Sequence, residues 1–324
     1  MAVSPDTAAP KPSFLEAAAV YLQPRVLIVL FLGFSSGLPL ALSGSTLLFW
    51  AAEVGVNLKT IGLFALVGTP YTLKFLWAPV VDAIEVPILA RWLGRRRAWL
   101  LLTQVLLIAA ILFLGANDPA SAPGAVAIGA LMVAAVSATQ DIVVDAFRIE
   151  SLDENEQAAG MASYVAAYRV GMLASSAGAL YAVSGFQASG FSKSNAWSAG
   201  YAAMAVLGVV GILTTLVAAE PKKSEAAEAV HARESPVERL KRTVTGAFLD
   251  FFQHDGLIVS VVVLAFVVLF KFTDSLSGVM TGPFAVDLGF SRTDYANIVK
   301  GVGLIALLAG GFAGGYIARA LPLA

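Results

Sequence analysis

The chain contains no cysteine, only two histidines and few charged residues. The absence of cysteine excludes disulfide bonds and thiolate metal sites. Both histidines, His231 and His254, lie in a polar stretch, so no histidine metal centre is expected among the apolar segments. Charged residues make up 13% of the 324 residues, and hydrophobic residues make up 58%. Because a soluble domain carries about 25% charged residues, these proportions indicate an integral membrane protein with several spans.

Apolar runs long enough to cross a bilayer divide the chain into four regions. Residues 1–25 lack the basic start and cleavage site of a signal peptide, so we expect a cytoplasmic tail. Residues 26–219 hold six predicted spans, and residues 256–324 hold two. The polar segment 220–255 is predicted to be a cytoplasmic linker that ends in an amphipathic helix. The predicted spans cover about residues 26–50, 59–81, 98–116, 124–146, 158–183, 199–219, 256–280 and 295–319, and the loops between them include 148–157 and 184–197.

Basic residues gather in the predicted loops on one side of the membrane. That side includes the loop with Arg91 and 95–97 and the linker 220–255, whereas the other side clearly holds only Lys193 and Arg292. Because short loops rich in Lys and Arg stay in the cytoplasm, the N-terminus and the linker are predicted to be cytoplasmic.

One stretch at the end of the fourth predicted span carries Gln140, Asp141 and Asp145. A charged side chain at membrane depth costs about 2.5–3.5 kcal/mol on insertion scales, so it generally faces the protein interior and has a partner or a function. Asp141 and Asp145 are four residues apart and therefore project from the same helical face, with Arg148 further along the chain. We assign Gln140, Asp141 and Asp145 to a candidate substrate and proton pathway. For Asp145 the alternative, a structural ion pair with Arg148 or with the loop arginines, outweighs the substrate role.

Other charges are predicted to share the membrane interior with Asp141. Lys74 in the second span lies at a similar depth, so we predict that it is the partner of Asp141. Arg169 lies near the middle of the fifth span and must face a cavity or a carboxylate, because exposure to lipid is costly there. Lys271 and Asp274 are three residues apart in the seventh span, so they either pair with each other or face a shared cavity.

A second charged group lies at the cytoplasmic ends of the second and third predicted spans. Asp82 ends the second span, and Gly94, Arg95, Arg96 and Arg97 precede the third. Opposite charges at neighbouring helix ends are expected to pair. We therefore interpret this group as a structural latch that favours one conformation of the protein.

Several stretches, in order and correctly spaced, match one family pattern. The most specific are Lys-Phe-Leu-Trp-Ala-Pro at 74–79 and Gln-Asp-Ile-Val-Val-Asp at 140–145, and the others are at 33–42, 58–62, 94–100, 168–173 and 271–274. Together they resemble the AmpG muropeptide permeases, inner-membrane transporters of the major facilitator superfamily. The resemblance covers about residues 20–319. The chain departs from the family pattern in two ways. Ala83 rather than arginine follows Asp82, and the chain has about eight predicted spans where family members have about twelve. The smaller number of spans leads us to expect a fragment or a truncated gene.

The resemblance implies an all-α polytopic membrane protein with a complete N-terminal six-helix bundle and the first two helices of a second bundle. It implies a proton-coupled importer of anhydromuropeptides in the bacterial inner membrane, with a sugar–peptide substrate, no cofactor other than the coupling proton and no nucleic-acid partner. In the family plan, the helices of Asp141 and of the pair Lys271 and Asp274 line one cavity. A cavity with both signs of charge suits an amphoteric solute, and burial of a carboxylate favours its protonated form, which suits proton coupling.

Two other functions stay open at this point: transport of another solute such as acetyl-CoA, and a non-transporting role in membrane assembly or pigment delivery. The spacing of Gln140, Asp141, Val144 and Asp145 favours the muropeptide permeases. An enzyme is not expected, because the chain shows no nucleophile–base arrangement, phosphate loop or metal-ligand cluster. The glycine-rich stretch 301–315 marks a close helix interface, so the chain alone, without further helices, is expected not to transport. The sequence does not indicate an oligomeric state.

Overall fold

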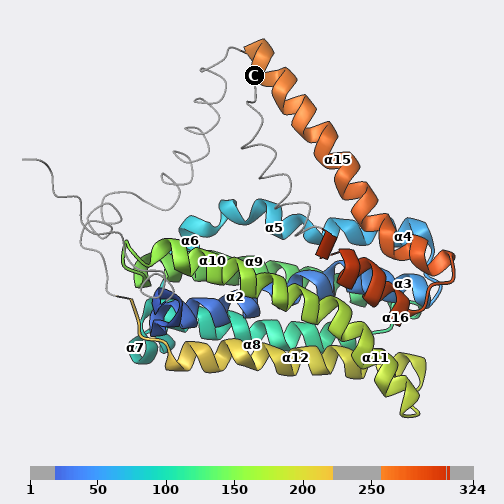
Figure 1. The fold of residues 1–324 in the computed structure, drawn as a ribbon, viewed down its shortest axis with the longest axis horizontal. Coiled ribbons are helices and arrows are strands. Elements are labelled where there is room, and N and C mark those ends of the chain that lie inside the picture. Colours follow the sequence, from blue (N-terminus) through green and yellow to red (C-terminus); the bar gives the residue numbers. More distant parts are fainter. Residues whose placement is uncertain (1–18, 222–256, 304, 307–324) are drawn as a thin grey trace, which may run out of the picture.

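The computed structural model describes residues 19–221, 257–303, 305 and 306, and every regular element among them is a helix (Figure 1). The predicted all-α class is therefore confirmed for this part of the chain. The predicted tail up to residue 18, the linker from 222 onward and residues 307–324 lie outside the described residues. Four described stretches are long and apolar enough to cross a membrane: Pro24–Glu53, Arg95–Gly115, Pro123–Ser151 and Lys193–Val217.

The first span consists of two helices, α2 (Pro24–Ser43) and α3 (Ser45–Glu53), joined at Gly44. Gly44 has φ −112° and ψ −112°, outside the helical region, so the helix changes course there. A proline can begin α2 because the first helical N–H groups have no partner within the helix. A short helix, η1 (Val20–Leu22), precedes α2, so the predicted tail 1–25 is helical over its last residues and the first span begins earlier than predicted.

The second predicted span, 59–81, is not one continuous helix. Its residues form five short helices, two of which carry a proline as their second residue, Pro70 and Pro79. Proline has no N–H and clashes with the preceding turn, so each proline ends one helix and permits the next to start. The short helices are α4 (Leu58–Phe64), η2 (Ala65–Gly68), α5 (Thr69–Leu73), η3 (Lys74–Leu76) and α6 (Ala78–Ala83), and α7 (Leu89–Leu93) follows them.

The third, fourth and sixth predicted spans are long helices, α8 (Arg95–Gly115), α9 (Pro123–Ser151) and α12 (Lys193–Val217). Helix α9 continues past the predicted end at residue 146, so the predicted loop 148–157 is helical as far as Ser151. Helix α12 begins before the predicted residue 199 because Ser192 caps it: the Ser192 side chain accepts a hydrogen bond from the Asn195 amide. The predicted loop 184–197 is correspondingly shorter.

The fifth predicted span follows a helical path that contains one widened turn. Helix α10 (Gln157–Leu173) leads into the π-helix η4 (Ala174–Gly178), which leads into α11 (Ala179–Ala188). The path therefore runs five residues beyond the predicted end at 183. A π-helical turn inserts one extra residue per turn and often lies at a functional site.

The region predicted to begin the second half of the protein starts with α15 (Leu257–Asp287), which is longer than the predicted span 256–280 and contains Pro283. The short helix α16 (Arg292–Tyr295) and a second π-helix, η5 (Ala296–Val302), follow. Only this first part of the eighth predicted span, 295–319, lies within the described residues.

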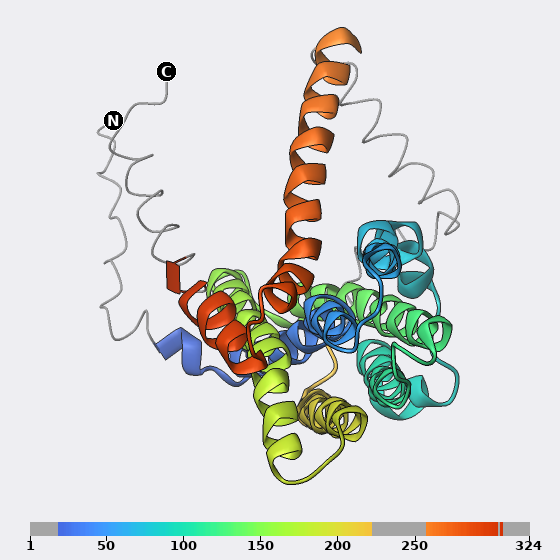
Figure 2. The same ribbon diagram turned by 90° about the vertical axis from the view of Figure 1, so that its right-hand side faces the viewer.

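Helix α2 lies in the centre of the described helices, where it contacts α9, α10 and α12 (Figures 1 and 2). Helix α8 packs against both α9 and α12. Gly37 allows the close contact between α2 and α10, because a Cβ atom at Gly37 would lie 2.1 Å from the Tyr168 carbonyl oxygen. Small residues at such interfaces let two membrane helices approach each other.

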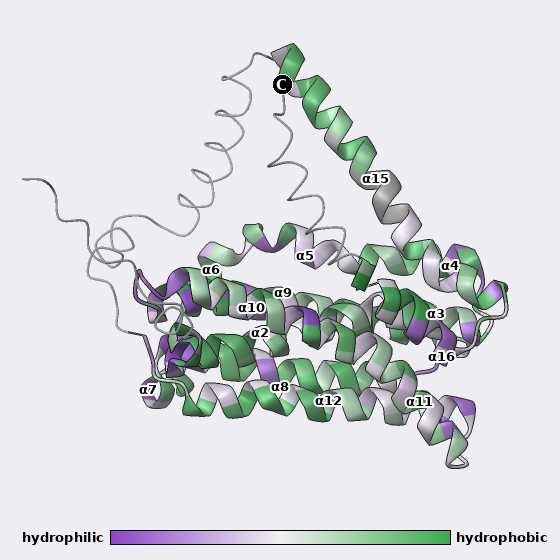
Figure 3. Ribbon diagram, in the orientation of Figure 1, coloured by the Kyte–Doolittle hydropathy of each residue, from purple (hydrophilic) through white to green (hydrophobic). Residues whose placement is uncertain are grey.

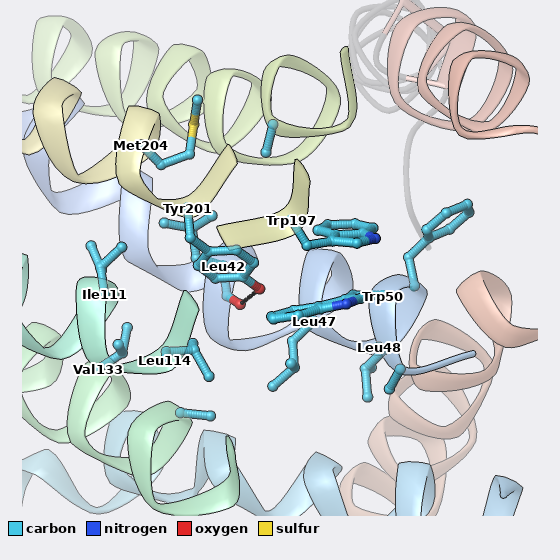
Figure 4. Close-up of a cluster of buried hydrophobic side chains, with 14 of the residues drawn as sticks. Leu42, Leu47, Leu48, Trp50, Ile111, Leu114, Val133, Trp197, Tyr201 and Met204 are labelled. Carbon is cyan, nitrogen blue, oxygen red and sulfur yellow. Dashed lines mark hydrogen bonds between the residues drawn. The ribbon is translucent and has the colours of Figure 1, made fainter. Parts of the chain in front are cut away.

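A large aromatic cluster lies where α3 meets α12 (Figure 4). The rings of Trp50 and Trp197 stack with their centroids 5.2 Å apart, and the Tyr201 hydroxyl donates a 2.9 Å hydrogen bond to the Leu42 carbonyl. We call this end of the helices the Glu53 end, because α3 ends there at Glu53. The opposite end, where α8 begins, is called the Arg96 end.

Among the described helices, α15 makes its main contacts through its C-terminal part. It packs against α3 and α4 at the Glu53 end and then diverges from the bundle (Figures 1 and 2). Its apolar side chains between 258 and 270 are mostly exposed in the described structure. Figure 3 shows that hydrophobic residues dominate the long helices, whereas hydrophilic residues gather near their ends.

Candidate functional site

The centre of the candidate site is the ion pair between Asp141 on α9 and Lys74 at the start of η3. The Lys74 Nζ atom lies 3.9 Å from Asp141 Oδ2. Asp141 is buried, whereas the Lys74 side chain is 34% exposed. The structure thus places the two predicted partners together, at a separation longer than a hydrogen bond.

Three hydroxyl groups near Asp141 escaped the sequence analysis: those of Ser36 on α2, Tyr71 on α5 and Ser137 on α9. Like Asp141 Oδ1, all three oxygens are buried and make no well-formed hydrogen bond among the described residues, although Ser36 lies beside Asp141 and Tyr71 lies beside Ser137. Ser137 precedes Asp141 by one helical turn and therefore shares its face. Because most buried polar atoms in proteins do have a partner, these oxygens form a polar set that can serve a solute or a proton.

Gln140 points to a different polar cluster. Its Nε2 atom lies 3.5 Å from the Ser35 hydroxyl oxygen on α2. Gln104 on α8 is also buried and accepts a 3.0 Å hydrogen bond from the Thr215 hydroxyl on α12. Gly211 brings these helices together, because a Cβ atom there would lie 2.3 Å from the Ser35 hydroxyl oxygen. Gln140 therefore contributes to the contact between α2 and α9 rather than to the Asp141 pair.

Asp145 pairs with Arg148, and 3.9 Å separate Asp145 Oδ1 from Arg148 Nη2. Arg148 is one of the two structural partners predicted for Asp145; the loop arginines were the other. The Asp145 side chain is 47% exposed. Arg169 is exposed on α10 and makes no ion pair among the described residues. The backbone of Lys271 and Asp274 lies in α15, but their side chains lie outside the described ones, so their predicted place in a shared cavity is not tested.

At the Arg96 end, the predicted latch residues come together around Arg96, whose side chain is only 5% exposed. Arg96 Nη1 lies 2.7 Å from Asp82 Oδ1, and Arg96 Nε donates a 3.0 Å hydrogen bond to Glu150. Arg95 donates a 2.8 Å hydrogen bond to the Asp82 carbonyl oxygen. The sequence analysis missed Glu150, which it assigned to a loop, because the predicted end of α9 was too early.

The Glu220 carboxylate binds the N-terminal end of α8. It accepts hydrogen bonds of 2.8 Å and 3.0 Å from the backbone amides of Arg96 and Arg97. A carboxylate in this position satisfies helix N–H groups that have no partner within the helix and interacts favourably with the helix dipole. The Arg97 side chain turns the other way and donates 2.9 Å and 2.8 Å hydrogen bonds to the carbonyls of Thr215 and Leu216. The Arg96 end thus ties α8 to α6, α9 and the end of α12.

At the Glu53 end, Arg292 is buried and links the segment after α15 to three other helices. Arg292 Nε lies 2.9 Å from Glu53 Oε1 on α3, and Arg292 Nη1 donates a 2.6 Å hydrogen bond to Gln187 on α11. The guanidinium also lies over the Trp197 ring of α12, 5.5 Å from the ring centroid. Trp197 in turn donates a 2.8 Å hydrogen bond to Glu53. We call Glu53, Gln187, Trp197 and Arg292 the Arg292 cluster.

Residues 29–323 match the Major Facilitator Superfamily model. The anhydromuropeptide permease of Escherichia coli is 37% identical over 306 residues, which are 94% of this chain and 57% of that protein. The putative transporter AmpG 4 of Rickettsia felis is 32% identical over 293 residues, 90% of this chain and 67% of that protein. The chain thus spans a little over half the length of the Escherichia coli permease. It belongs to the Major Facilitator Superfamily, and its relatives there are transporters of the AmpG type.

Proposed function

We propose that the protein is a proton-coupled secondary transporter that imports anhydromuropeptides across the bacterial inner membrane. The observation that carries the proposal is the Asp141–Lys74 pair, a buried carboxylate and a partly exposed ammonium 3.9 Å apart. Asp141 lies in the candidate membrane span of α9, and Lys74 lies in the second span predicted from the sequence. Charges at membrane depth are costly and generally serve a solute or proton pathway. The solute comes from the relatives, one of which is an anhydromuropeptide permease.

In the proposed mechanism, Asp141 alternates between two partners. When Asp141 is ionised, it pairs with Lys74, and when it takes up a proton, the pair is released. Lys74 then becomes available to an anionic group of the solute, because it already has one third of its side chain exposed. The hydroxyls of Ser36, Tyr71 and Ser137 make no well-formed hydrogen bond among the described residues, so they can hydrogen-bond to the protonated carboxyl or to the solute.

The proposed solute is amphoteric because the candidate site carries both signs of charge. Lys74 and Arg169 supply positive charge for the carboxylates of a sugar–peptide, and Asp145 supplies negative charge for an amine. Exposed Arg169 has no ion-pair partner among the described residues, and an arginine at this depth in contact with lipid would be costly. We propose that Lys271 and Asp274 face the same solute from the second half.

The proposal includes an arrangement in the membrane. The six predicted spans of residues 26–219 form the N-terminal bundle, α15 and the segment after it begin the second bundle, and the N-terminus and linker are cytoplasmic. The Arg96 end then faces the cytoplasm, and Asp82, Gly94, Arg95, Arg96 and Arg97 form a latch on that side. Support comes from the basic loop residues and from the ion pairs of Arg96.

The test is uptake of a labelled anhydromuropeptide by cells expressing the natural gene product that contains this chain. Asp141→Asn should abolish accumulation driven by a proton gradient, whereas Asp118→Asn should leave it unchanged. Asp118 is the matched control because it lies in the turn between α8 and α9, away from the candidate site. Undiminished accumulation by Asp141→Asn would contradict proton coupling at this residue. Uptake of acetyl-CoA but not of muropeptide would contradict the proposed solute.

A further inference from the structure

The Glu53 end is the place where the described second-half residues hold the first-half helices. Arg292 contacts Glu53, Gln187 and Trp197, which lie on α3, α11 and α12. A second polar contact lies beside this cluster, where the Tyr181 hydroxyl on α11 donates a hydrogen bond to Asn297 on η5. The two π-helices, η4 and η5, also pack against each other there.

The apolar contacts at this end also join residues of the first half to residues of the second half. The ring centroids of Phe49 on α3 and Tyr295 on α16 lie 4.9 Å apart. Gly282 on α15 packs close to Phe49, since a Cβ atom at Gly282 would lie 3.6 Å from the Phe49 amide nitrogen. By contrast, α15 diverges from the other helices toward its N-terminal part, where its described side chains are mostly exposed (Figure 2). Contact between the halves is therefore concentrated at the Glu53 end.

We propose that the Arg292 cluster is a gate that closes the Glu53 end of the pathway leading to Asp141. The proposal rests on the transport function proposed above and names the residues that must separate when the site opens toward that end. In the structure the Arg292 side chain contacts α3, α11 and α12 at once, and we take this arrangement as the closed state.

The chemistry of the cluster suits a contact that opens as a unit. Glu53 keeps two partners on its own side when α16 leaves, because the Trp197 indole donates to its carboxylate and Lys193 Nζ donates a 2.9 Å hydrogen bond to its carbonyl. Arg292 exchanges its protein partners for water, and guanidinium is readily hydrated once exposed. The Glu53 carboxylate therefore keeps one hydrogen-bond donor, Trp197, and its side chain is already 19% exposed, which lowers the main cost of breaking a buried ion pair.

The test measures access to Ser43, which is buried at the end of α2, between Ser36 beside Asp141 and Glu53 along the first span. Because the chain has no cysteine, Ser43→Cys introduces a single reactive thiol. A membrane-impermeant maleimide is applied to right-side-out and to inverted vesicles, so that both ends are tested. With the gate intact, labelling from the Glu53 end should be slow. Adding Arg292→Ala should increase the rate of this labelling about tenfold. A loss of about 1.4 kcal/mol of contact energy increases the population of the open gate by this factor.

Three variants make the result specific. Asp294→Asn is the matched control, because Asp294 is charged and lies on the same helix but caps α16 by bonding to Ser291 instead of joining the cluster. It should leave the labelling rate unchanged. Arg292→Lys keeps the charge and should give a smaller increase than Arg292→Ala. Tyr181→Phe removes only the hydroxyl that binds Asn297, so it tests the gate without removing a buried charge.

Equal labelling rates in the presence and absence of Arg292→Ala and Tyr181→Phe would overturn the gate. Correct folding of each variant is checked by its elution in detergent and by rapid labelling of the exposed position Ser189→Cys. Solute uptake by the natural gene product that contains this chain is measured in parallel. Faster labelling in the variants without any uptake would contradict the proposed transport but support the gate, whereas uptake with unchanged labelling would support transport and contradict the gate.

Discussion

The Glu220 carboxylate occupies the space that a side chain on Gly94 would need. A Cβ atom built on Gly94 would lie 2.4 Å from Glu220 Cδ, and Gly94 has φ +86°, a conformation that favours glycine. This approach allows Glu220 to bind the first amides of α8. The glycine of the Gly-Arg-Arg-Arg stretch is therefore needed for a helix cap as well as for the turn.

Gly94→Ala should destabilise the protein because it introduces both a strained φ and a clash with Glu220. The expected loss is about 1–3 kcal/mol, measured as a lower midpoint of thermal unfolding in detergent. Gly185→Ala is the control, since no neighbour lies within 4 Å of a Cβ there and the residue is inside α11. It should be neutral or stabilising by up to about 1 kcal/mol. Equal midpoints for the two variants would contradict the role of Gly94.

Glu150→Ala should be more destabilising than Asp82→Ala. Arg96 makes two hydrogen bonds with Glu150 and one with Asp82, and Arg96 is buried. Removing one partner of a buried ion pair costs about 3–5 kcal/mol, and we expect Glu150→Ala to approach this range.

An exposed pair provides the control for this comparison. Arg25 and Asp153 lie 2.8 Å apart with both side chains more than half exposed. Asp153→Ala should therefore change the unfolding free energy by at most about 1 kcal/mol. A larger loss for Asp153→Ala than for Glu150→Ala would show that burial does not decide the strength of these pairs.

The double variant Lys74→Ala with Asp141→Ala separates a structural role from a coupling role. Removing both charges of a pair is often nearly neutral for stability, so the double variant should fold and reach the membrane. If Asp141 carries the coupling proton, this variant should not accumulate solute against a gradient. Accumulation by a well-expressed double variant would exclude the coupling role of Asp141 and direct attention to Asp274.

Cysteine labelling in intact cells tests the orientation. Ser189 lies in the turn between α11 and α12, which is predicted to be periplasmic, whereas Ser224 lies in the predicted cytoplasmic linker. Ser189→Cys should react with an impermeant maleimide, and Ser224→Cys should react only after the cells are permeabilised. The opposite labelling pattern would reverse the proposed arrangement.

Part of the candidate site could be predicted from sequence because depth along a helix follows from residue count. Lys74 and Asp141 lie at similar predicted depths, and the structure pairs them. The helix breaks were harder to predict, because Pro70 and Pro79 lie in an apolar run that hydropathy alone treats as continuous. The ends of α9 and α12 were misplaced because polar residues in their last and first turns resemble a loop when read by composition.

The amino-acid sequence by itself determined the helical membrane-protein class, because few charges and apolar runs of about 20 residues indicate helices that cross a bilayer with their backbone groups paired internally. It also indicated the partner of Asp141. Only the tertiary structure decided which distant residues meet, because side-chain direction and helix packing are not encoded in local periodicity. Glu220 contacts Gly94, Glu150 contacts Arg96, and Glu53 contacts Arg292, across sequence separations of up to 239 residues. Burial among packed helices strengthens these contacts because it removes competing water.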